Sequence, residues 1–279
     1  MSAMRTVSTR TGAVLPVLGQ GTWKMGSEAR RKEEVAAIRL GIDLGMTMID
    51  TAEMYGSGGA EEMVGEAIAG KRDSIFLVTK VLPSNASKEG TILAAERSLK
   101  RLRTDRIDLY LLHWESQHPL ADTLAAFEKL HADGKVLNYG VSNFDLDEVK
   151  HAEALTGGSR VAANQVLYNL KRRGIERTLM PWCVKKGIVI MAYSPLDEGA
   201  LARDPVLEKI GKRHGATSAR VAIAWTIRQQ GVVSIPKSSK SEHVRENAAA
   251  AAFEFTKEDL AELDAAFPAP TTSIPLETA

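Results

Sequence analysis

Short apolar segments alternate with amphipathic segments along most of the chain. The apolar segments predict eight β-strands, at residues 18–21, 47–49, 75–79, 109–113, 137–141, 163–166, 188–192 and 233–235. Several of them are almost wholly apolar, which is typical of parallel strands that are buried on both faces of a sheet. Apolar positions at helical spacing predict helices between them, at residues 31–44, 61–69, 88–102, 120–133, 146–155, 175–186 and 219–229.

Strands that alternate with helices predict βαβ units and an α/β fold. Eight such units favour a closed (β/α)8 TIM barrel over an open, doubly wound sheet, and one domain over residues 1–279. Residues 6–14 contain the turn signal Thr11-Gly12 between short β-like runs, which predicts an N-terminal hairpin at the bottom of the barrel. Extra helices are predicted near the C-terminus, at 207–214 and 256–267, and the tail from Pro268 is predicted to be a loop.

Composition excludes several classes of protein. A length of 279 residues fits one barrel of roughly 250 residues. The formal net charge is +1 and no long basic run occurs, so no nucleic-acid partner is expected. Cys183 is the only cysteine, which rules out an intrachain disulfide. No apolar run approaches the roughly 18 residues of a membrane span, and the start of the chain lacks the apolar region of a signal peptide. We therefore expect a cytoplasmic protein without a membrane partner, and a monomer.

Polar and ionisable residues stand where the predicted strands end. In chain order these are Asp50, Lys80, His113, Ser142, Asn143, Gln165, Tyr193, Ser194 and Lys237. In a (β/α)8 barrel the carboxyl ends of all strands meet on one face, and that face carries the active site. Any one of these residues taken alone is more readily explained as structural, but together they favour one shared site.

The chemistry that suits this set is proton delivery to a carbonyl oxygen. Tyr55 is a weak acid with an ordinary pKa near 10, and a neighbouring Lys80 ammonium is expected to lower that pKa. Asp50 can hold Lys80 as an ion pair, and His113 can orient a substrate oxygen by a hydrogen bond. No glycine-rich phosphate loop, paired cysteines or metal-ligand spacing is found, so no metal is expected.

Eight stretches together resemble the aldo-keto reductase family over essentially the whole chain. They are Gly19-Gln20-Gly21-Thr22-Trp23, Ile49-Asp50-Thr51-Ala52-Glu53-Met54-Tyr55-Gly56, Val78-Thr79-Lys80, Leu111-Leu112-His113-Trp114, Gly140-Val141-Ser142-Asn143-Phe144, Asn164-Gln165-Val166, Ala192-Tyr193-Ser194-Pro195-Leu196 and Ile235-Pro236-Lys237-Ser238. Each stretch alone is a weak to moderate signal, whereas eight in order at barrel spacing are a strong one.

The resemblance implies a catalytic tetrad and an NADP(H) cofactor. The tetrad would be Asp50, Tyr55, Lys80 and His113, with Tyr55 as general acid. Tyr193 would stack on the nicotinamide, and Lys237 would meet the 2′-phosphate. The full set of implied cofactor residues is Gly21, Thr22, Trp23, Asp50, Ser142, Asn143, Gln165, Tyr193, Ser194, Pro195, Leu196, Ile235, Pro236, Lys237, Ser238, Ser239, His243, Glu246 and Asn247.

The resemblance also implies the kind of substrate. Trp23, Met54, His113 and Trp114 would line the substrate pocket, and the order Glu53-Met54-Tyr55 is most similar to bacterial members that reduce methylglyoxal and other small aldehydes. Short loops after the predicted strands imply an open pocket. His243 stands where many NADP-specific members carry Arg, so NADP(H) is expected to be preferred while NAD(H) stays usable.

Two other functions stay open at this point. Lys80 could form a Schiff base as in an aldolase, although a neighbouring Asp50 disfavours the neutral amine that this requires. Alternatively, the chain could be a non-catalytic regulatory subunit that senses a cofactor on the same fold, since fold alone does not imply activity. Borohydride trapping would identify the first, and absence of NADPH turnover would identify the second.

Overall fold

The computed structural model of the protein describes residues 4–158 and 160–278. Within these residues, eight parallel strands pair in chain order to form one sheet. They are β3 (Gly19–Gly21), β4 (Met48–Asp50), β5 (Phe76–Val81), β6 (Ile107–Leu112), β7 (Val136–Ser142), β8 (Val161–Leu167), β9 (Val189–Tyr193) and β10 (Val232–Ser234). Each overlaps one predicted strand, and the predicted (β/α)8 architecture is confirmed.

The sheet closes on itself between its first and last strands. Leu18 forms a parallel bridge with Ser234, and Gly21 forms another with Lys237. The close approach explains the glycine, because a Cβ on Gly21 would lie 2.7 Å from the carbonyl oxygen of Ile235. Closure places the carboxyl ends of all eight strands around one opening, which is where the polar residues of the sequence pattern lie.

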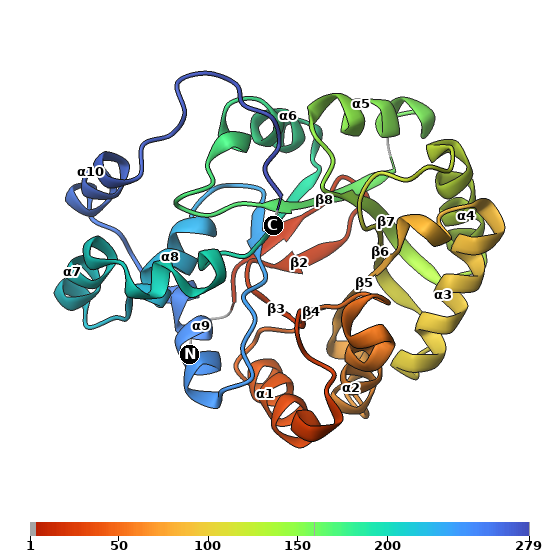
Figure 1. The fold of residues 1–279 in the computed structure, drawn as a ribbon, viewed down its shortest axis with the longest axis horizontal. Coiled ribbons are helices and arrows are strands. Elements are labelled where there is room, and N and C mark those ends of the chain that lie inside the picture. Colours follow the sequence, from red (N-terminus) through yellow and green to blue (C-terminus); the bar gives the residue numbers. More distant parts are fainter. Residues whose placement is uncertain (1–3, 159, 279) are drawn as a thin grey trace.

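Helices surround the barrel (Figure 1), and each of them follows one of the barrel strands in the chain. They are α1 (Arg31–Asp43), α2 (Gly59–Ala67), α3 (Lys88–Leu102), α4 (Leu120–Ala132), α5 (Leu146–Leu155), α6 (Leu179–Lys186), α7 (Pro205–His214), α8 (Ser218–Thr226), α9 (Ser241–Ala249) and α10 (Lys257–Ala266). The expected extra helices correspond to α7 and α10. Helix α9 was not predicted along its length, because only Val244 and Asn247 of its residues are buried and its apolar periodicity is weak.

The predicted hairpin is present as β1 (Thr6–Ser8) and β2 (Val14–Pro16), which pair antiparallel. It lies at the amino ends of the strands: the backbone N–H of Arg10 donates to the carbonyl of Gly187, just before β9, and Thr11 donates to Asn138 at the start of β7. Leu15 of the hairpin packs into the cluster of side chains that fills the barrel interior. Within the described residues, the hairpin therefore covers the bottom of the barrel, and the cavity lies at the opposite end.

The C-terminal tail after α10 is a loop, as predicted, but it is held in a defined place. Figure 1 shows it running from α10 back towards the middle of the barrel. Glu277 accepts a hydrogen bond from Arg172 at 2.7 Å, and the backbone N–H of Leu276 donates to Asp145 at 3.2 Å. These contacts carry the tail to the open end of the barrel, which the sequence did not predict.

Candidate active site

Asp50 and Lys80 reach the open end of the barrel from neighbouring strands. Asp50 is the last residue of β4, and Lys80 lies near the end of β5. Tyr55 begins the turn that leads from β4 to α2, and the turn reverses sharply because Gly56, Ser57 and Gly58 all adopt positive φ. The strand ends and this turn bring Lys80 into contact with Asp50 and Tyr55, which lie 30 and 25 positions before it in the chain.

The Lys80 ammonium is hydrogen-bonded on all sides. It donates to Oδ2 of Asp50 at 2.8 Å, to the carbonyl of Thr51 at 2.8 Å and to the hydroxyl of Tyr55 at 3.2 Å. An ammonium has three N–H groups, so these acceptors use all of them. The other oxygen of Asp50 accepts from Nε2 of Gln165 at 2.7 Å. Because Lys80 donates to the Tyr55 oxygen, the phenol keeps its own O–H free to donate into the cavity.

Burial raises the pKa of Tyr55 above its ordinary value, and this outweighs the opposing effect of Lys80, while the charge of Asp50 raises the pKa further. Lys80 does lower the pKa of Tyr55, as expected, but the desolvation of the buried phenol is the larger effect and makes the net shift upward. Burial also lowers the pKa of Lys80, but Asp50 and Tyr55 together reverse that effect, so Lys80 stays charged. Tyr55 thus holds its proton at neutral pH beside a permanent cation.

His113 follows β6 and completes the set of four. Its ring centroid lies 5.8 Å from that of Tyr55 and 4.8 Å from that of Trp114. Burial and the nearby Lys80 charge lower the pKa of His113 to about 3. The imidazole is therefore neutral throughout the physiological range, and it can offer a single N–H to a ligand without placing a second cation beside Lys80.

A second hydrogen-bonded group spans the ends of β7 and β9. The hydroxyl of Tyr193 donates to Oδ1 of Asn143 at 2.8 Å, and Nδ2 of Asn143 donates to the carbonyl of His113 at 3.1 Å. The Ser142 hydroxyl donates to the carbonyl of Gln165 at 2.9 Å. Asn143 and Ser194 have φ of 57° and 50°. Such strain in non-glycine residues is concentrated at functional sites, and it supports a ligand site here.

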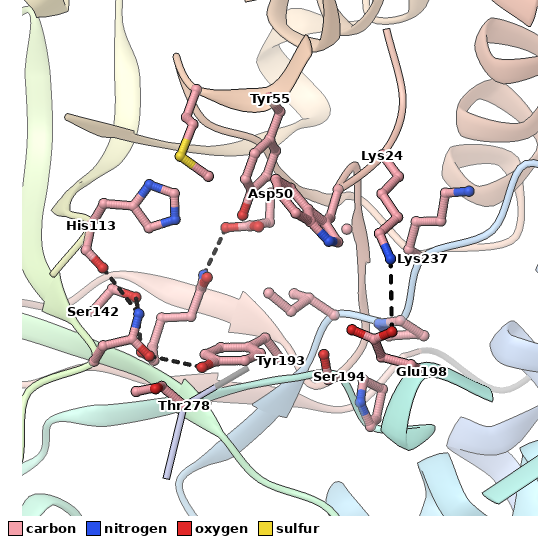
Figure 2. A pocket seen from close by; sticks show the side chains of 18 of the residues that line it. Lys24, Asp50, Tyr55, His113, Ser142, Tyr193, Ser194, Glu198, Lys237 and Thr278 are labelled. Carbon is pink, nitrogen blue, oxygen red and sulfur yellow. Dashed lines mark hydrogen bonds and ion pairs between the residues drawn. The ribbon is translucent and has the colours of Figure 1, made fainter. Parts of the chain in front are cut away.

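These residues share one cavity of about 920 Å³ (Figure 2). This volume lies within the range of roughly 300–1,000 Å³ that is usual for small-molecule and cofactor sites. The predicted site residues in its wall are Gly21, Trp23, Asp50, Met54, Tyr55, His113, Trp114, Ser142, Asn143, Gln165, Tyr193, Ser194, Pro195, Leu196, Ile235, Pro236 and Lys237. Lys80 lies behind this wall, fully buried, and contacts it through Asp50 and Tyr55.

Other predicted cofactor residues lie outside the cavity wall. Thr22 is buried, and its hydroxyl donates to the carbonyl of Asp50. The other predicted cofactor residues come after Lys237 in the chain and lie either in the segment before α9 or in α9 itself. They are Ser238, Ser239, His243, Glu246 and Asn247. The Glu246 carboxylate accepts from Arg220 and Thr217, so it joins α9 to α8. Cofactor contacts at these positions stay predictions.

The wall also includes residues that the sequence did not single out: Lys24, Glu115, Glu198, Gly199 and Thr278. Lys24 and Glu198 form an ion pair at 3.7 Å, drawn in Figure 2. Glu115 directly follows His113-Trp114, so its place beside the motif was a usable signal. Thr278 reaches the cavity only because tertiary contacts hold the tail, and no local sequence signal indicates that.

The donors in this wall fit a nicotinamide dinucleotide. The amides of Asn143 and Gln165 and the hydroxyl of Ser142 can bind a carboxamide, the ring of Tyr193 offers a flat apolar face, and Lys237 supplies a cation for phosphate. The same wall does not present a metal site: among residues 4–158 and 160–278, no group of three or more His, Cys, Asp or Glu could hold an ion. In that same part of the chain, no helix is long and apolar enough to cross a membrane.

Comparison with known proteins gives one consistent picture. Residues 17–267 match the model of the aldo/keto reductase family. Methylglyoxal reductase YeaE of Escherichia coli is 50% identical over 262 residues, which cover 92% of each chain. The glyoxal reductase of Bacillus subtilis is 37% identical, over 93% of this chain and 92% of the relative.

Solved structures are similar over nearly the whole chain. An aldo/keto reductase from Klebsiella pneumoniae, crystallised in complex with NADP and acetate, has a TM-score of 0.96 and 44% identity. The overlap covers 99% of this chain and 100% of the Klebsiella chain. A second structure of an aldo-keto reductase from that organism, with NADPH, is similar to the same degree, at TM-score 0.96 and 44% identity.

Proposed function

The chain belongs to the aldo/keto reductase family, and we propose that Asp50, Tyr55, Lys80 and His113 carry its reaction. The protein is an oxidoreductase that catalyses the NADPH-dependent reduction of a carbonyl group to an alcohol. The observation that carries the residue assignment is the 3.2 Å hydrogen bond from Lys80 to the Tyr55 oxygen. In this hydrogen bond the Tyr55 oxygen is the acceptor, so the proton of the Tyr55 hydroxyl remains available for the substrate.

Tyr55 is the proton donor. When bound, the reduced nicotinamide supplies the hydride that the carbonyl carbon receives. The carbonyl oxygen then needs a proton, and the Tyr55 hydroxyl stands at the cavity wall to give it. As the proton leaves, negative charge develops on the phenol oxygen, and the Lys80 ammonium is already in place to stabilise that charge. Asp50 and the carbonyl of Thr51 hold Lys80 in that position.

His113 orients the substrate oxygen rather than protonating it. A pKa of about 3 leaves the imidazole neutral at the pH of the reaction. One ring N–H can donate to the carbonyl oxygen beside Tyr55, which fixes the geometry of proton transfer. Because the ring carries no charge, it does not compete with Lys80 for the developing negative charge.

The cofactor is held by the other strand ends. We assign the carboxamide to Ser142, Asn143 and Gln165, and the stacking face to Tyr193, whose hydroxyl is fixed by Asn143. We assign the 2′-phosphate to Lys237, which makes NADP(H) the preferred cofactor. NAD(H) remains usable, because His243 is exposed and its imidazole offers a phosphate fewer hydrogen-bond donors than the planar fork of an Arg would.

The substrates that we propose are small aldehydes, including methylglyoxal. Trp23 and Trp114 are 46% and 39% exposed at the cavity wall, and Met54 lies beside them in that wall. Such exposed aromatic residues form an open apolar mouth. The most similar relatives named above reduce methylglyoxal or glyoxal, which supports the assignment. We also propose that one domain over residues 1–279 acts as a monomer in the cytoplasm, without a nucleic-acid or membrane partner.

The Schiff-base alternative is disfavoured by the state of Lys80. A lysine nucleophile must lose its proton, whereas the pKa of Lys80 is raised by Asp50 and Tyr55 against the effect of burial. All three of its N–H groups are also engaged. No observation favours the non-catalytic sensor over an enzyme.

The test is a screen of NADPH consumption over small aldehydes, dicarbonyls, sugars, ketones and steroids. We expect turnover of methylglyoxal and aromatic aldehydes and weak activity on bulky steroids. Efficient steroid reduction with small aldehydes ignored would contradict the proposed substrate class. Failure to oxidise NADPH with any carbonyl compound would contradict the residue assignment and favour the sensor.

A further inference from the structure

Five charged side chains lie in the cavity wall among the residues that the structure describes: Lys24, Asp50, Glu115, Glu198 and Lys237. Two of the negative charges are compensated. Asp50 is paired with Lys80 at 2.8 Å, and Glu198 is paired with Lys24 at 3.7 Å. For residues 4–158 and 160–278, no cation lies within 4.0 Å of the Glu115 carboxylate, and no carboxylate lies that close to Lys237.

The two uncompensated charges lie at opposite ends of the cavity. Lys237 forms the bridge to Gly21 that closes the barrel. In Figure 2 it stands with Lys24 and Glu198, across the cavity from His113. Glu115 comes directly after His113-Trp114, at the end where the substrate carbonyl meets His113. Among the described residues, the cofactor end thus presents a cation without an ion-pair partner, and the substrate end presents a carboxyl group without one.

Nothing else in the wall near Glu115 offsets its charge. The other described wall residues at this end are neutral: Trp23, Met54, Trp114 and Thr278. Glu115 contacts a second acid, Glu148 of α5, by a side-chain hydrogen bond. Burial raises the pKa of Glu148, the backbone N–H of Asp145 opposes this, and contact with the Glu115 carboxyl raises it further. Two acidic side chains therefore lie together at the substrate end, and no described side chain forms an ion pair with Glu115.

From this arrangement we propose that Glu115 makes the substrate end selective for charge: neutral and cationic carbonyl compounds are accepted, and those that carry a carboxylate are disfavoured. The inference rests on the proposed function, since it concerns the substrate of that same site. A carboxylate brought to this end would meet like charge and no cation to pair with, whereas an ammonium would meet Glu115. Aminoaldehydes are the cationic class that fits such an end.

The experiment uses three benzaldehydes that differ in the para group: carboxylate, hydrogen and trimethylammonium. The quantity measured is kcat/KM for each aldehyde at saturating NADPH and low ionic strength. The kcat/KM of each charged aldehyde is then divided by that of benzaldehyde. Ratios remove any general loss of activity in a variant, and comparing the same ratio between variants removes the intrinsic reactivity of each aldehyde.

In Glu115→Gln we expect the carboxylate ratio to rise and the trimethylammonium ratio to fall, each by about two- to fivefold, the effect of one exposed charge. Glu115→Lys should extend both changes in the same directions. Salt at about 0.5 M should reduce the differences, because it screens exposed charges. Glu254→Gln is the matched control: it removes one exposed carboxylate that does not line the cavity, and it should leave both ratios unchanged.

Equal ratios in the wild type, Glu115→Gln and Glu115→Lys would overturn the role of Glu115 while the enzyme still reduced benzaldehyde. A wild-type preference for the carboxylate that survives in Glu115→Gln would overturn it as well. Failure of the proposed function looks different: the wild type would then reduce none of the three aldehydes, benzaldehyde included, and this inference would fail with it.

Discussion

The floor and the rim of the cavity hold their charged side chains in contrasting ways. The floor consists of Asp50, Tyr55 and Lys80. Asp50 and Lys80 are 2% and 0% exposed, and each hydrogen-bonding group of the Lys80 ammonium has a protein acceptor. The rim consists of Lys24, Glu198 and Lys237, and His243 lies beyond it on α9. The ion pair of the rim, Lys24–Glu198, is 3.7 Å long, with side chains that are 64% and 69% exposed.

This contrast follows from where the residues stand on the barrel. Floor residues lie at the ends of strands or in a turn that is tied to them, so the sheet fixes their positions before any ligand binds. Rim residues lie in loops, where solvent screens their charges. Breaking a buried ion pair typically costs about 3–5 kcal/mol, whereas an exposed pair contributes about 0–1 kcal/mol. Changes on the floor should therefore be severe, and changes on the rim should be small and specific to a ligand.

The largest effect is expected from Tyr55→Phe. This change keeps the ring that contacts Trp23 and His113 but removes the proton donor. We expect carbonyl reduction to fall by about 10²–10⁴-fold, the usual contribution of general acid catalysis. Binding of NADPH, measured by quenching of protein fluorescence, should change little. A variant with near wild-type kcat on an aldehyde would remove Tyr55 from this role.

Lys80→Met should come next, with kcat lowered by about 10²-fold, the lower end of that range. Reduction needs a protonated Tyr55, so its rate falls as pH rises through the pKa of Tyr55. Lys80 is the group that lowers this pKa against burial. Its loss should therefore move the alkaline limb of the pH–kcat profile to higher pH. If this variant kept the wild-type rate and pH profile, Lys80 would have no role in the proton transfer from Tyr55.

Stability separates the two roles of Lys80. The single variant leaves the Asp50 carboxylate buried without its cation, and we expect the free energy of unfolding to fall by about 3–5 kcal/mol. Asp50→Asn combined with Lys80→Met removes both charges and should recover much of that loss, as measured by urea unfolding. It should not recover the rate, because the Tyr55 phenol still lacks its cation.

The floor could be predicted from sequence because its residues are tied to strands that periodicity reveals. Asp50 and Lys80 follow apolar segments that are recognisable as buried strands, and both lie at the expected end of the barrel. What the sequence did not reveal on the floor was the desolvation of Tyr55. Lys80 lowers the pKa of Tyr55 as expected, whereas the depth of burial, which only the folded chain reveals, sets the direction of the net pKa shift.

The rim was predicted less well, because its geometry depends on contacts between distant segments. Thr278 enters the cavity wall only because Arg172 and Asp145 hold the tail by contacts to residues more than 100 positions away. Glu198 faces Lys24 because residues 197–199 adopt positive φ. Gly199 and, more weakly, Asp197 favour positive φ, but Glu198 does not, so the sequence indicates a turn here without indicating that Glu198 takes part in it.

On the rim, Lys237→Met should produce the largest change. If Lys237 meets the 2′-phosphate, its loss should raise the KM for NADPH about tenfold, near the lower end of the value of a charged hydrogen bond because the side chain is exposed. The KM for NADH should change little, since NADH lacks that phosphate. Equal increases for the two cofactors would show that Lys237 contacts a part that they share.

The smallest effect is expected from His243→Arg. His243 is exposed on α9 and outside the cavity wall, so any charge placed there acts through solvent. An imidazole has at most two N–H donors to offer a phosphate, whereas an Arg guanidinium offers a planar fork of donors and a permanent charge. We therefore expect tighter NADPH binding, by up to about fivefold, the limit for an exposed pair, and no change for NADH. Titration of both cofactors by fluorescence quenching measures this, with His243→Gln as a control that changes the ring without adding charge. If Arg and Gln gave the same affinities, or if NADH and NADPH responded alike, α9 would lie too far from the 2′-phosphate to select the cofactor. Discrimination between NADPH and NADH would then rest with Lys237 alone among the rim cations tested.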